Sequence, residues 1–344
     1  MYCRNLFFLF FLTPSFVFSQ LTSADVKLEK IKNENRVDIY IGNILFTRFL
    51  YPDSLEKPVL YPLYDAGNTL VTRGFPMNPR AGEPTDHPHH LGLWFTYENV
   101  NGLDFWNNSY AIAAEKKSLY GWIKTDSILE ISGGRTGTLR YHANWVNQQN
   151  QVLLEETTLF EFSGNRDQRM IDRITILKAD TDILFTDAKD GLLGLRMAHE
   201  LQIPSLTEQK FTDNKGNITI VKKDTISNGN YLTSEGKSGD SAWSTRAVWC
   251  KAFGKIGLDS ISITLFDHSG NPNYPTFWHA RGYGLFAANP LGEKIFTNGS
   301  TSFNLKLKKG ETIRFCYRIL IQNGKTTFQT KYLDQVAKEF NKKY

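Results

Sequence analysis

Cysteine is scarce in this chain, which has 3 cysteines among 344 residues. Cys3 lies close to the N-terminus, so only Cys250 and Cys316 remain for the body of the protein. Each lies in an apolar, strand-like run, where a small buried thiol is as natural as one disulfide of an oxidising compartment. The sequence therefore excludes a disulfide-rich scaffold and leaves the state of these two thiols open.

Long apolar runs are also missing beyond residue 19. No later segment has the roughly 20 consecutive apolar residues that a transmembrane helix needs. At the N-terminus, Arg4 is followed by short apolar runs at residues 6–12 and 16–18. This pattern predicts a secretory signal peptide over residues 1–19, an uncleaved N-terminal anchor being the alternative. We expect the mature chain, residues 20–344, to be periplasmic or secreted and to have no membrane span.

Sequence motifs of several enzyme classes are missing. There is no Gly-x-Ser-x-Gly elbow, no phosphate-cradling loop and no dinucleotide fingerprint in a strand–helix context. The net charge of +5 is spread along the chain without a basic stripe, so no nucleic-acid partner is expected. Heptads, repeats and Pro- or Gly/Ser-rich linkers are absent as well, which favours one domain over residues 20–344.

Alternation of apolar and polar residues dominates what is present, and this pattern predicts β-strands. Clear cases are residues 152–162, 170–177 and 261–266. Residues 147–150 predict a turn before the first of these strands, because Asn and Gln cluster there between two alternating runs.

Near the C-terminus, residues 302–307 and 312–319 predict a hairpin across 308–311. A helix is expected after it, from apolar residues at helical spacing. The expected fold is therefore all-β: a large single-domain antiparallel β-sandwich with long functional loops and a C-terminal helix packed against a sheet. The apolar residues of that helix are Leu333, Val336, Ala337 and Phe340.

Three of the 7 histidines are packed into the segment Asp86-His87-Pro88-His89-His90. Because a proline ring disfavours the α region for the residue before it, we expect His87 to be extended. Alternate side chains of an extended segment share a face, so His87 and His89 are predicted to point one way and His90 the other. The apolar residues 91–95 then predict a buried strand. Imidazole suits proton transfer and metal ligation near neutral pH, so this segment predicts a site.

A His-x-His pair on extended backbone can present two imidazoles, here His87 and His89, to one divalent metal such as zinc or copper. His199, Glu200 and His279 are the candidates for a third ligand. Acid–base or substrate-binding histidines are equally compatible with the sequence, and so are purely structural ones. The sequence leaves these three interpretations open.

A second group of polar residues lies at residues 189–200. The alternation over residues 195–201 predicts a strand with Arg196 and Glu200 on one face and His199 on the other. Arg196 can then bind an anion or orient Glu200 inside a pocket. A surface ion pair between the two is the alternative, and such pairs contribute little.

A third group, Trp278, His279, Arg281 and Tyr283, precedes a Gly-rich turn, and Trp106 follows the histidine segment. Rings, an imidazole and a guanidinium beside a strand end fit a polar, ring-shaped ligand, which they bind by stacking and hydrogen bonding together. Ordinary strand packing with an exposed turn is the alternative.

Several of these segments resemble the PmoA-like family of exported bacterial proteins. The family's name refers to a methane oxygenase, but we do not expect that activity of this chain. A membrane-embedded oxygenase subunit needs several apolar spans. The His-Pro-His-His-Leu-Gly core is also similar to histidine motifs of sugar-mutarotase-like β-supersandwich proteins, a resemblance that implies a carbohydrate ligand. The matching pieces, within residues 57–322, are 58–64, 72–73, 86–94, 104–106, 189–191 and 281–292.

The sequence therefore predicts an exported enzyme that acts on a carbohydrate or sugar-derived ligand by epimerisation, elimination or hydrolysis. The alternatives are a non-catalytic glycan-binding protein and a copper- or zinc-dependent oxidase or hydrolase. The expected acid–base residues are His87, His89, His90, Glu200 and His279, and the expected substrate-binding residues are Arg73, Trp106, Arg196, Trp278, Arg281 and Tyr283.

Overall fold

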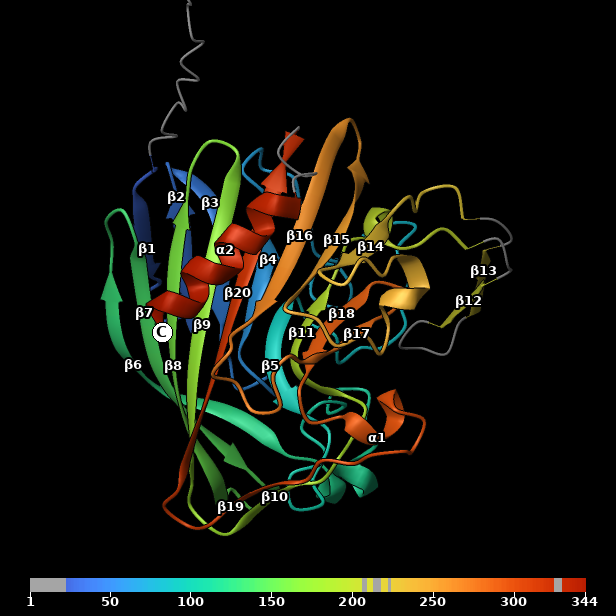
Figure 1. Cartoon of the computed structure of the whole chain (residues 1–344). Helices are drawn as coiled ribbons and strands as arrows, with labels where there is room; N and C mark the ends of the chain where they lie inside the picture. The colour runs from blue at the N-terminus through green and yellow to red at the C-terminus, as the bar shows by residue number, and fades with distance from the viewer. Residues whose placement is uncertain (1–22, 206–208, 213–217, 222–223, 325–329) are drawn as a thin grey trace, which may run out of the picture.

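The computed structural model describes residues 23–205, 209–212, 218–221, 224–324 and 330–344 (Figure 1). The predicted signal peptide lies outside these residues. Among the helices of the described residues, none is long and apolar enough to cross a membrane.

Two eight-stranded antiparallel sheets carry the fold, which confirms the predicted all-β sandwich. In order of neighbours, the first sheet consists of β1 (Val26–Lys30), β2 (Arg36–Ile41), β3 (Ile44–Leu50), β4 (Val59–Leu63), β5 (Leu93–Tyr97), β11 (Gly191–Arg196), β18 (Leu285–Asn289) and β17 (Phe277–Ala280). The second consists of β14 (Asn230–Thr233), β15 (Trp249–Ile256), β16 (Asp259–Asp267), β20 (Thr312–Asn323), β9 (Gln168–Ala179), β8 (Val152–Gly164), β7 (Gly137–Val146) and β6 (Trp122–Ser132).

The remaining elements of the described residues are two short strand pairs and several helical segments. Two short strand pairs are β10 (Ile183–Phe185) with β19 (Leu305–Leu307) and β12 (Gln209–Thr212) with β13 (Ile218–Val221). The helical elements of the described residues are η1 (Ala114–Leu119), η2 (His199–Leu201), η3 (Gly239–Ala242), α1 (Glu293–Phe296) and α2 (Thr330–Lys343).

The main core lies between the two sheets, where aromatic side chains of one sheet meet those of the other. Phe46 of β3 contacts Phe162 of β8, with ring centroids 6.3 Å apart. Phe95 of β5 contacts Trp145 of β7 at 6.3 Å. Edge-on contacts of this kind add to the free energy gained by burying the rings. The period-two alternation of the sequence thus supplies the facing apolar surfaces of a sandwich.

The first sheet is also covered on its outer face. In β5, Phe95 points into the main core, whereas Trp94 belongs to a second apolar cluster with Tyr61 and Trp106. A strand buried on both faces reads as a continuous apolar run, which is why residues 91–95 predicted a buried strand. The connections before and after β5 supply the cover, and the candidate site lies among them.

The C-terminal helix α2 packs on the outer face of the second sheet, as predicted (Figure 1). Cys250 and Cys316 are both buried free thiols, so the structure decides against a disulfide between them. The helix buries Leu333, Val336, Ala337 and Phe340 against a cluster that includes Trp249, Phe266, Cys316 and Leu320.

The pairing near the C-terminus differs from the sequence-based prediction. The turn at 147–150 is confirmed, because Val146 of β7 pairs with Val152 of β8. The hairpin across 308–311 is wrong: β19 pairs with β10, and β20 pairs with β9 and β16. The strand-like pattern was read correctly, but β20 gains more pairing and burial as a central strand of the second sheet than next to the short β19.

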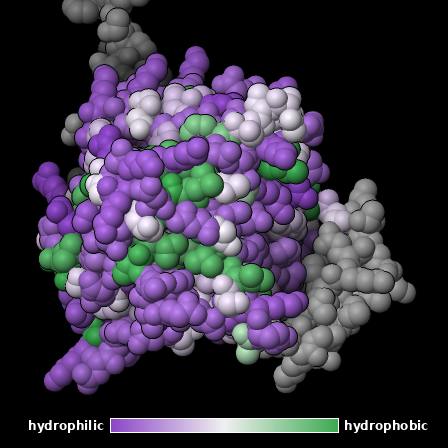
Figure 2. Space-filling view, turned by 90° about the horizontal axis from the view of Figure 1, so that it is seen from below, coloured by the Kyte–Doolittle hydropathy of each residue, from purple (hydrophilic) through white to green (hydrophobic). Residues whose placement is uncertain are grey.

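Seen from below, the surface is mainly hydrophilic, with apolar residues in short bands between larger polar areas (Figure 2). Such a mixture is ordinary for a protein surface, to which apolar atoms always contribute. This face alone therefore does not indicate a docking site.

Candidate functional site

The candidate site lies on the outer face of the first sheet, over β5, β11, β18 and β17. The register places Trp94 opposite Gly194, Gly194 opposite Ala287, and Ala287 opposite His279. Residues directly opposite in neighbouring strands share a face. These four residues therefore form one row across the sheet, with two small residues between the ring systems of Trp94 and His279.

Position 194 requires a glycine because indole rings lie directly over it. A Cβ at this position would lie 2.5 Å from Cζ2 of Trp94 and 2.7 Å from Cη2 of Trp106. Both indoles are fully buried, so neither can move aside into solvent. Because residue 194 has no side chain, Trp94 and Trp106 pack directly against β11 and contact His90. We call these two rings the floor of the site.

Gly194→Ala is expected to destabilise the protein by about 1–3 kcal/mol, the usual range for overpacking a tight interior. Urea unfolding followed by tryptophan fluorescence measures the free energy of unfolding and also reports displacement of the indoles. A variant with unchanged unfolding free energy and unchanged native emission would show that the floor accommodates the methyl group.

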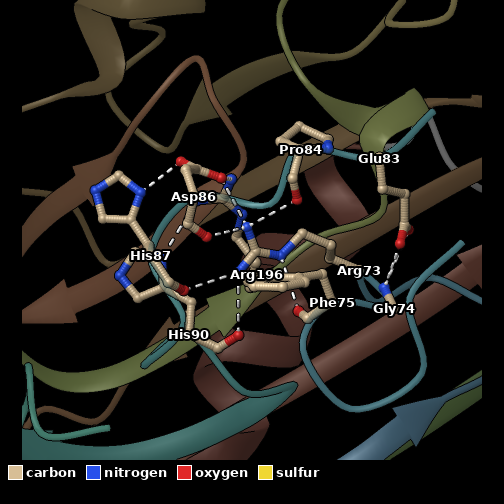
Figure 3. A network of polar contacts seen from close by, with 9 residues as sticks. All are labelled: Arg73, Gly74, Phe75, Glu83, Pro84, Asp86, His87, His90 and Arg196. Atoms are coloured by element: carbon tan, nitrogen blue, oxygen red, sulfur yellow. Dashed lines mark hydrogen bonds and ion pairs between the residues drawn. The ribbon is translucent and has the colours of Figure 1, made fainter. Parts of the chain in front are cut away.

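His87 and His90 lie at the two ends of a tight turn rather than in an extended segment (Figure 3). The N–H of His90 donates to the carbonyl oxygen of His87 over 3.1 Å, and His87 has a φ of +48°. The predicted alternation between two faces is therefore wrong. The rings of His87 and His90 stack with centroids 4.8 Å apart, and His89 meets both of them edge-on.

The buried guanidinium of Arg73 explains why this turn, which we call the histidine turn, overrides the preference imposed by Pro88. Its Nη2 donates to the carbonyl oxygens of His87 over 2.9 Å and of His90 over 3.4 Å. Its Nε donates to the carbonyl oxygen of Phe75 over 3.1 Å. All three nitrogens of Arg73 are engaged by the protein, so it builds the loop instead of holding substrate oxygens. Nη1 donates to Pro84 and Asp86.

Asp86 connects both arginines to the histidine turn. Its Oδ1 accepts from Nη1 of Arg73 and from Nη2 of Arg196, each over 2.8 Å, and its Oδ2 contacts Nδ1 of His87 (Figure 3). Burial raises the pKa of Asp86, but Arg196, His87 and Arg73 together outweigh burial and hold that pKa well below its usual range. Asp86 is therefore a carboxylate at neutral pH.

The protonation of His90 follows from its partner. Nη1 of Arg196 lies 3.2 Å from Nδ1 of His90. Arginine can only donate, so Nδ1 of His90 accepts and the proton of the neutral ring is on Nε2. Burial lowers the pKa of His90 well below its ordinary value, and the nearby charge of Arg196 adds to this effect. His90 is thus a neutral ring, stacked on Trp94 with centroids 5.3 Å apart.

His89 is the histidine of the turn whose ring nitrogens have no hydrogen-bond partner among the described residues. Burial lowers its pKa well below the ordinary value, and the positive charge of Lys57 lowers it further. Lys57 is itself buried, and its Nζ donates to the carbonyl oxygen of Trp106 over 2.7 Å. Burial lowers the pKa of Lys57 to about 7. A neutral, unpartnered imidazole beside a buried lysine is available to a ligand.

Lys57→Met is expected to raise the pKa of His89. In the wild type the positive charge of Lys57 disfavours the imidazolium ion, and the substitution removes this charge. The pKa is measured by titrating the imidazole resonances by NMR. Lys308→Met, which removes an exposed lysine paired with Asp182, serves as the matched control and should leave His89 unchanged. An unaltered His89 pKa in Lys57→Met would contradict the expected coupling.

The second and third sequence groups reach the histidine turn through Arg196 and Tyr283. The rings of Tyr283 and His87 are parallel, with centroids 5.2 Å apart. The guanidinium carbons of Arg196 and Arg281 lie 4.9 and 5.8 Å from the centroid of Tyr283. The structure therefore brings together residues from all three sequence groups, which the sequence could not show.

His199 and Glu200 lie elsewhere, because β11 ends at Arg196 and residues 199–201 form η2. The strand predicted over residues 195–201 is therefore wrong in its second half. Nδ1 and Nε2 of His199 lie 3.0 Å from the carbonyl oxygen of Gly82 and from Oδ2 of Asp224. These contacts tie the loop before the histidine turn to the segment after η2. Glu200 faces Arg80, not Arg196.

His279 and Trp278 lie on opposite faces of β17. Nδ1 of His279 lies 3.2 Å from the carbonyl oxygen of Lys189 and 3.5 Å from Oδ1 of Asp190. Burial lowers the pKa of His279 to about 3, so its ring is neutral. Trp278 lies in the main core, where its Nε1 donates to the carbonyl oxygen of Ala247. Trp278 is therefore a residue of the main core and does not line the site.

The set of metal ligands suggested by the sequence is not assembled among the described residues. Among them, no group of three His, Cys, Asp or Glu side chains is placed to hold an ion. His87 and His89 meet edge to face, and Nδ1 of His87 is occupied by Asp86. The donors proposed from the sequence thus do not converge on one point.

Two residues of the site were missed by the sequence reasoning. Lys57 precedes the apolar strand β4, and a charged residue at the edge of such a run is an observable but weak signal. Asp190 lies in the Lys189–Gly191 segment and faces both Lys189 and His279. Burial raises the pKa of Asp190, so it is a second perturbed carboxyl group near the histidines.

The sequence matches a family of unknown function, DUF6807, over residues 36–337. The chain belongs to this family. The comparisons give no support to the PmoA-like part of the resemblance drawn from the sequence. No protein of curated function matches the chain.

Solved structures match over most of the chain at low identity. The Slr1438 protein of Synechocystis sp. PCC 6803 shares 7% identity at a TM-score of 0.34, over 91% of this chain and 99% of its own. A galactose mutarotase related enzyme of Lactobacillus acidophilus shares 9% at 0.30, over 88% and 99%. The galactosidase domain of the α-galactosidase–sucrose kinase AgaSK shares 10% at 0.38, over 87% of this chain and 42% of its own.

Proposed function

We propose that the protein is an enzyme that uses His87 for proton transfer on a carbohydrate or sugar-derived small molecule. The observation that carries the proposal is the Asp86–His87 pair. An ionised carboxylate, held by the buried Arg73 and Arg196, contacts Nδ1 of an imidazole whose side chain is 41% exposed.

This pairing sets the reactive nitrogen of His87. Asp86 accepts a hydrogen bond from Nδ1–H, so the lone pair of the neutral ring is on Nε2, where it can take a proton from a substrate. The ring is also fixed in orientation, because it stacks on both His90 and Tyr283. A carboxylate that orients an imidazole is the arrangement that general base catalysis uses.

Groups around His87 suit a ligand rich in hydroxyl groups. His89 offers a donor and an acceptor, His90 offers its Nε2–H, and Tyr283 offers a hydroxyl with no hydrogen-bond partner among the described residues. Burial raises the pKa of Tyr283 to about 12, so the phenol keeps its proton. Epimerisation, elimination and hydrolysis of sugars each need a base and a neutral donor of this kind.

The test is turnover of a panel of mono- and oligosaccharides and sugar acids by the purified protein. We expect the wild type to convert at least one compound and His87→Ala to lower kcat/KM by about 10²-fold or more. His142→Ala is the matched control, since His142 forms the same kind of pair with Asp126 on the second sheet. Binding of a sugar without turnover would show a binding protein instead, and equal activity of the wild type and His87→Ala would exclude the proposed base.

We also propose that the protein is exported, on the strength of the sequence over residues 1–19. N-terminal sequencing of protein recovered from the periplasm or the medium is expected to begin near Gln20. Recovery of the uncleaved chain with the membrane fraction would favour an N-terminal anchor.

A further inference from the structure

Positive charge is in excess around the Tyr283 side of the histidine turn. Arg73 and Arg196 are both fully buried, and both donate to the same oxygen, Oδ1 of Asp86. Two guanidinium charges therefore share one carboxylate. The Nε of Arg196 is buried and has no hydrogen-bond partner among the described residues.

Arg281 adds a third guanidinium at the rim of the same site. Its side chain is exposed and lies between two rings, 5.6 Å from the centroid of Trp243 and 5.8 Å from that of Tyr283. No carboxylate of the described residues lies within ion-pair distance of it. Tyr283 also stacks on His87, so the exposed cation and the proposed base contact the same ring.

The acidic residues on the other side of the site do not neutralise these arginines. Asp190 faces Lys189 over 3.4 Å and His279 over 3.5 Å. Asp104 accepts hydrogen bonds from the backbone and side chain of Asn107. Glu98 accepts from the N–H of Asp190. Each of these acids has its own partner among the described residues, so the exposed guanidinium of Arg281 is left to a ligand.

We propose that the substrate is an acidic sugar, and that Arg281 binds its carboxylate while His87 acts on a neighbouring position of the ring. This inference rests on the proposed function and narrows its substrate class. The planar fork of an arginine matches a carboxylate with two parallel hydrogen bonds. One exposed guanidinium suits a singly charged carboxylate better than a doubly charged phosphate.

The test compares sugars that differ only at C6. Binding of glucuronate, glucose and glucose 6-phosphate, and of galacturonate and galactose, is measured by calorimetry with the wild type, Arg281→Gln and Arg166→Gln. We expect the acid of at least one pair to bind about tenfold more tightly or better than the neutral sugar, and this preference to weaken with added salt. Arg281→Gln should bring the acid to the level of the neutral sugar. Arg166→Gln removes an arginine that is 90% exposed at the β8–β9 turn and should change nothing.

Equal binding of acid and neutral sugar, a preference that survives in Arg281→Gln, or absence of binding by any acid would overturn the inference. Tighter binding of glucose 6-phosphate than of glucuronate would overturn the choice of a carboxylate. The proposed function is judged separately, because turnover of a neutral sugar that depends on His87 would leave it standing. Glucuronate binding by His87→Ala distinguishes the proposed base from the proposed acid-binding site, since the variant should still bind the acid.

Discussion

Asp86→Asn is expected to destabilise the protein by about 3–5 kcal/mol, the range observed when one partner of a buried ion pair is removed. The substitution is nearly isosteric, but it leaves the guanidinium groups of Arg73 and Arg196 buried without a counter-charge. The residual activity of the folded fraction should also fall, by about 10²–10⁴-fold. The amide N–H₂ would donate to Nδ1 of His87 and so place the ring proton on Nε2, where the base needs a lone pair.

Chemical denaturation gives the free energy of unfolding of Asp86→Asn, and kcat/KM is measured on protein shown to be folded. Asp126→Asn is the matched control, because Asp126 pairs with Nδ1 of His142 over 2.7 Å with 46% of the Asp126 side chain exposed. It should cost less than about 1 kcal/mol. Comparable stability of Asp86→Asn and Asp126→Asn would show that Asp86 does not compensate the buried arginines.

The same pair predicts how stability depends on pH. The folded pKa of Asp86 lies below its usual range, so its contribution is present above the unfolded pKa of about 3.9 and is lost as the pH falls through the folded value. Between pH 5 and pH 3 the wild type should therefore lose more stability than Asp86→Asn. Parallel stability curves over this range would contradict the assignment.

The sheets could be predicted from the sequence because the period of two is a local property of each strand. Residues 152–162 and 170–177 fall inside β8 and β9 for this reason. Strand partners are not local, and so the prediction of a hairpin ending in β20 was wrong. The burial that decides for β9 and β16 as its neighbours comes from segments far away in the chain.

The residues of the site were visible in the sequence, but their geometry was not. Asp86 and the three histidines are adjacent, whereas Arg73 is 13 residues from Asp86 and Arg196 is 110 residues from it. Those two side chains decide that the segment is a turn and that Asp86 is ionised. A prediction made from Pro88 and its sequence neighbours cannot take these two distant arginines into account. The position of Lys57 is a weak signal in the sequence, but its burial follows only from the cover of the first sheet.

Glu156→Ala is expected to destabilise the protein as strongly as the change at Asp86, by about 3–5 kcal/mol, while leaving the site intact. Glu156 is fully buried on β8, and its Oε1 accepts from Nη2 of Arg173 over 2.7 Å and from the hydroxyl of Tyr141 over 2.7 Å. Its Oε2 accepts from Nε1 of Trp145 over 2.8 Å. Arg173 lies between two rings of the main core, so its charge would have no solvent to replace the carboxylate.

The neighbouring residue provides the control for Glu156→Ala. Glu155 points to the other face of β8, where it forms an exposed pair with Lys178, and Glu155→Ala should cost less than about 1 kcal/mol. Urea unfolding of both variants gives the two free energies, and sugar binding by the folded protein should be unchanged in each. Because Glu156 lies between the sheets and the histidine turn lies outside them, a loss of binding in folded Glu156→Ala would contradict the independence of the core from the site.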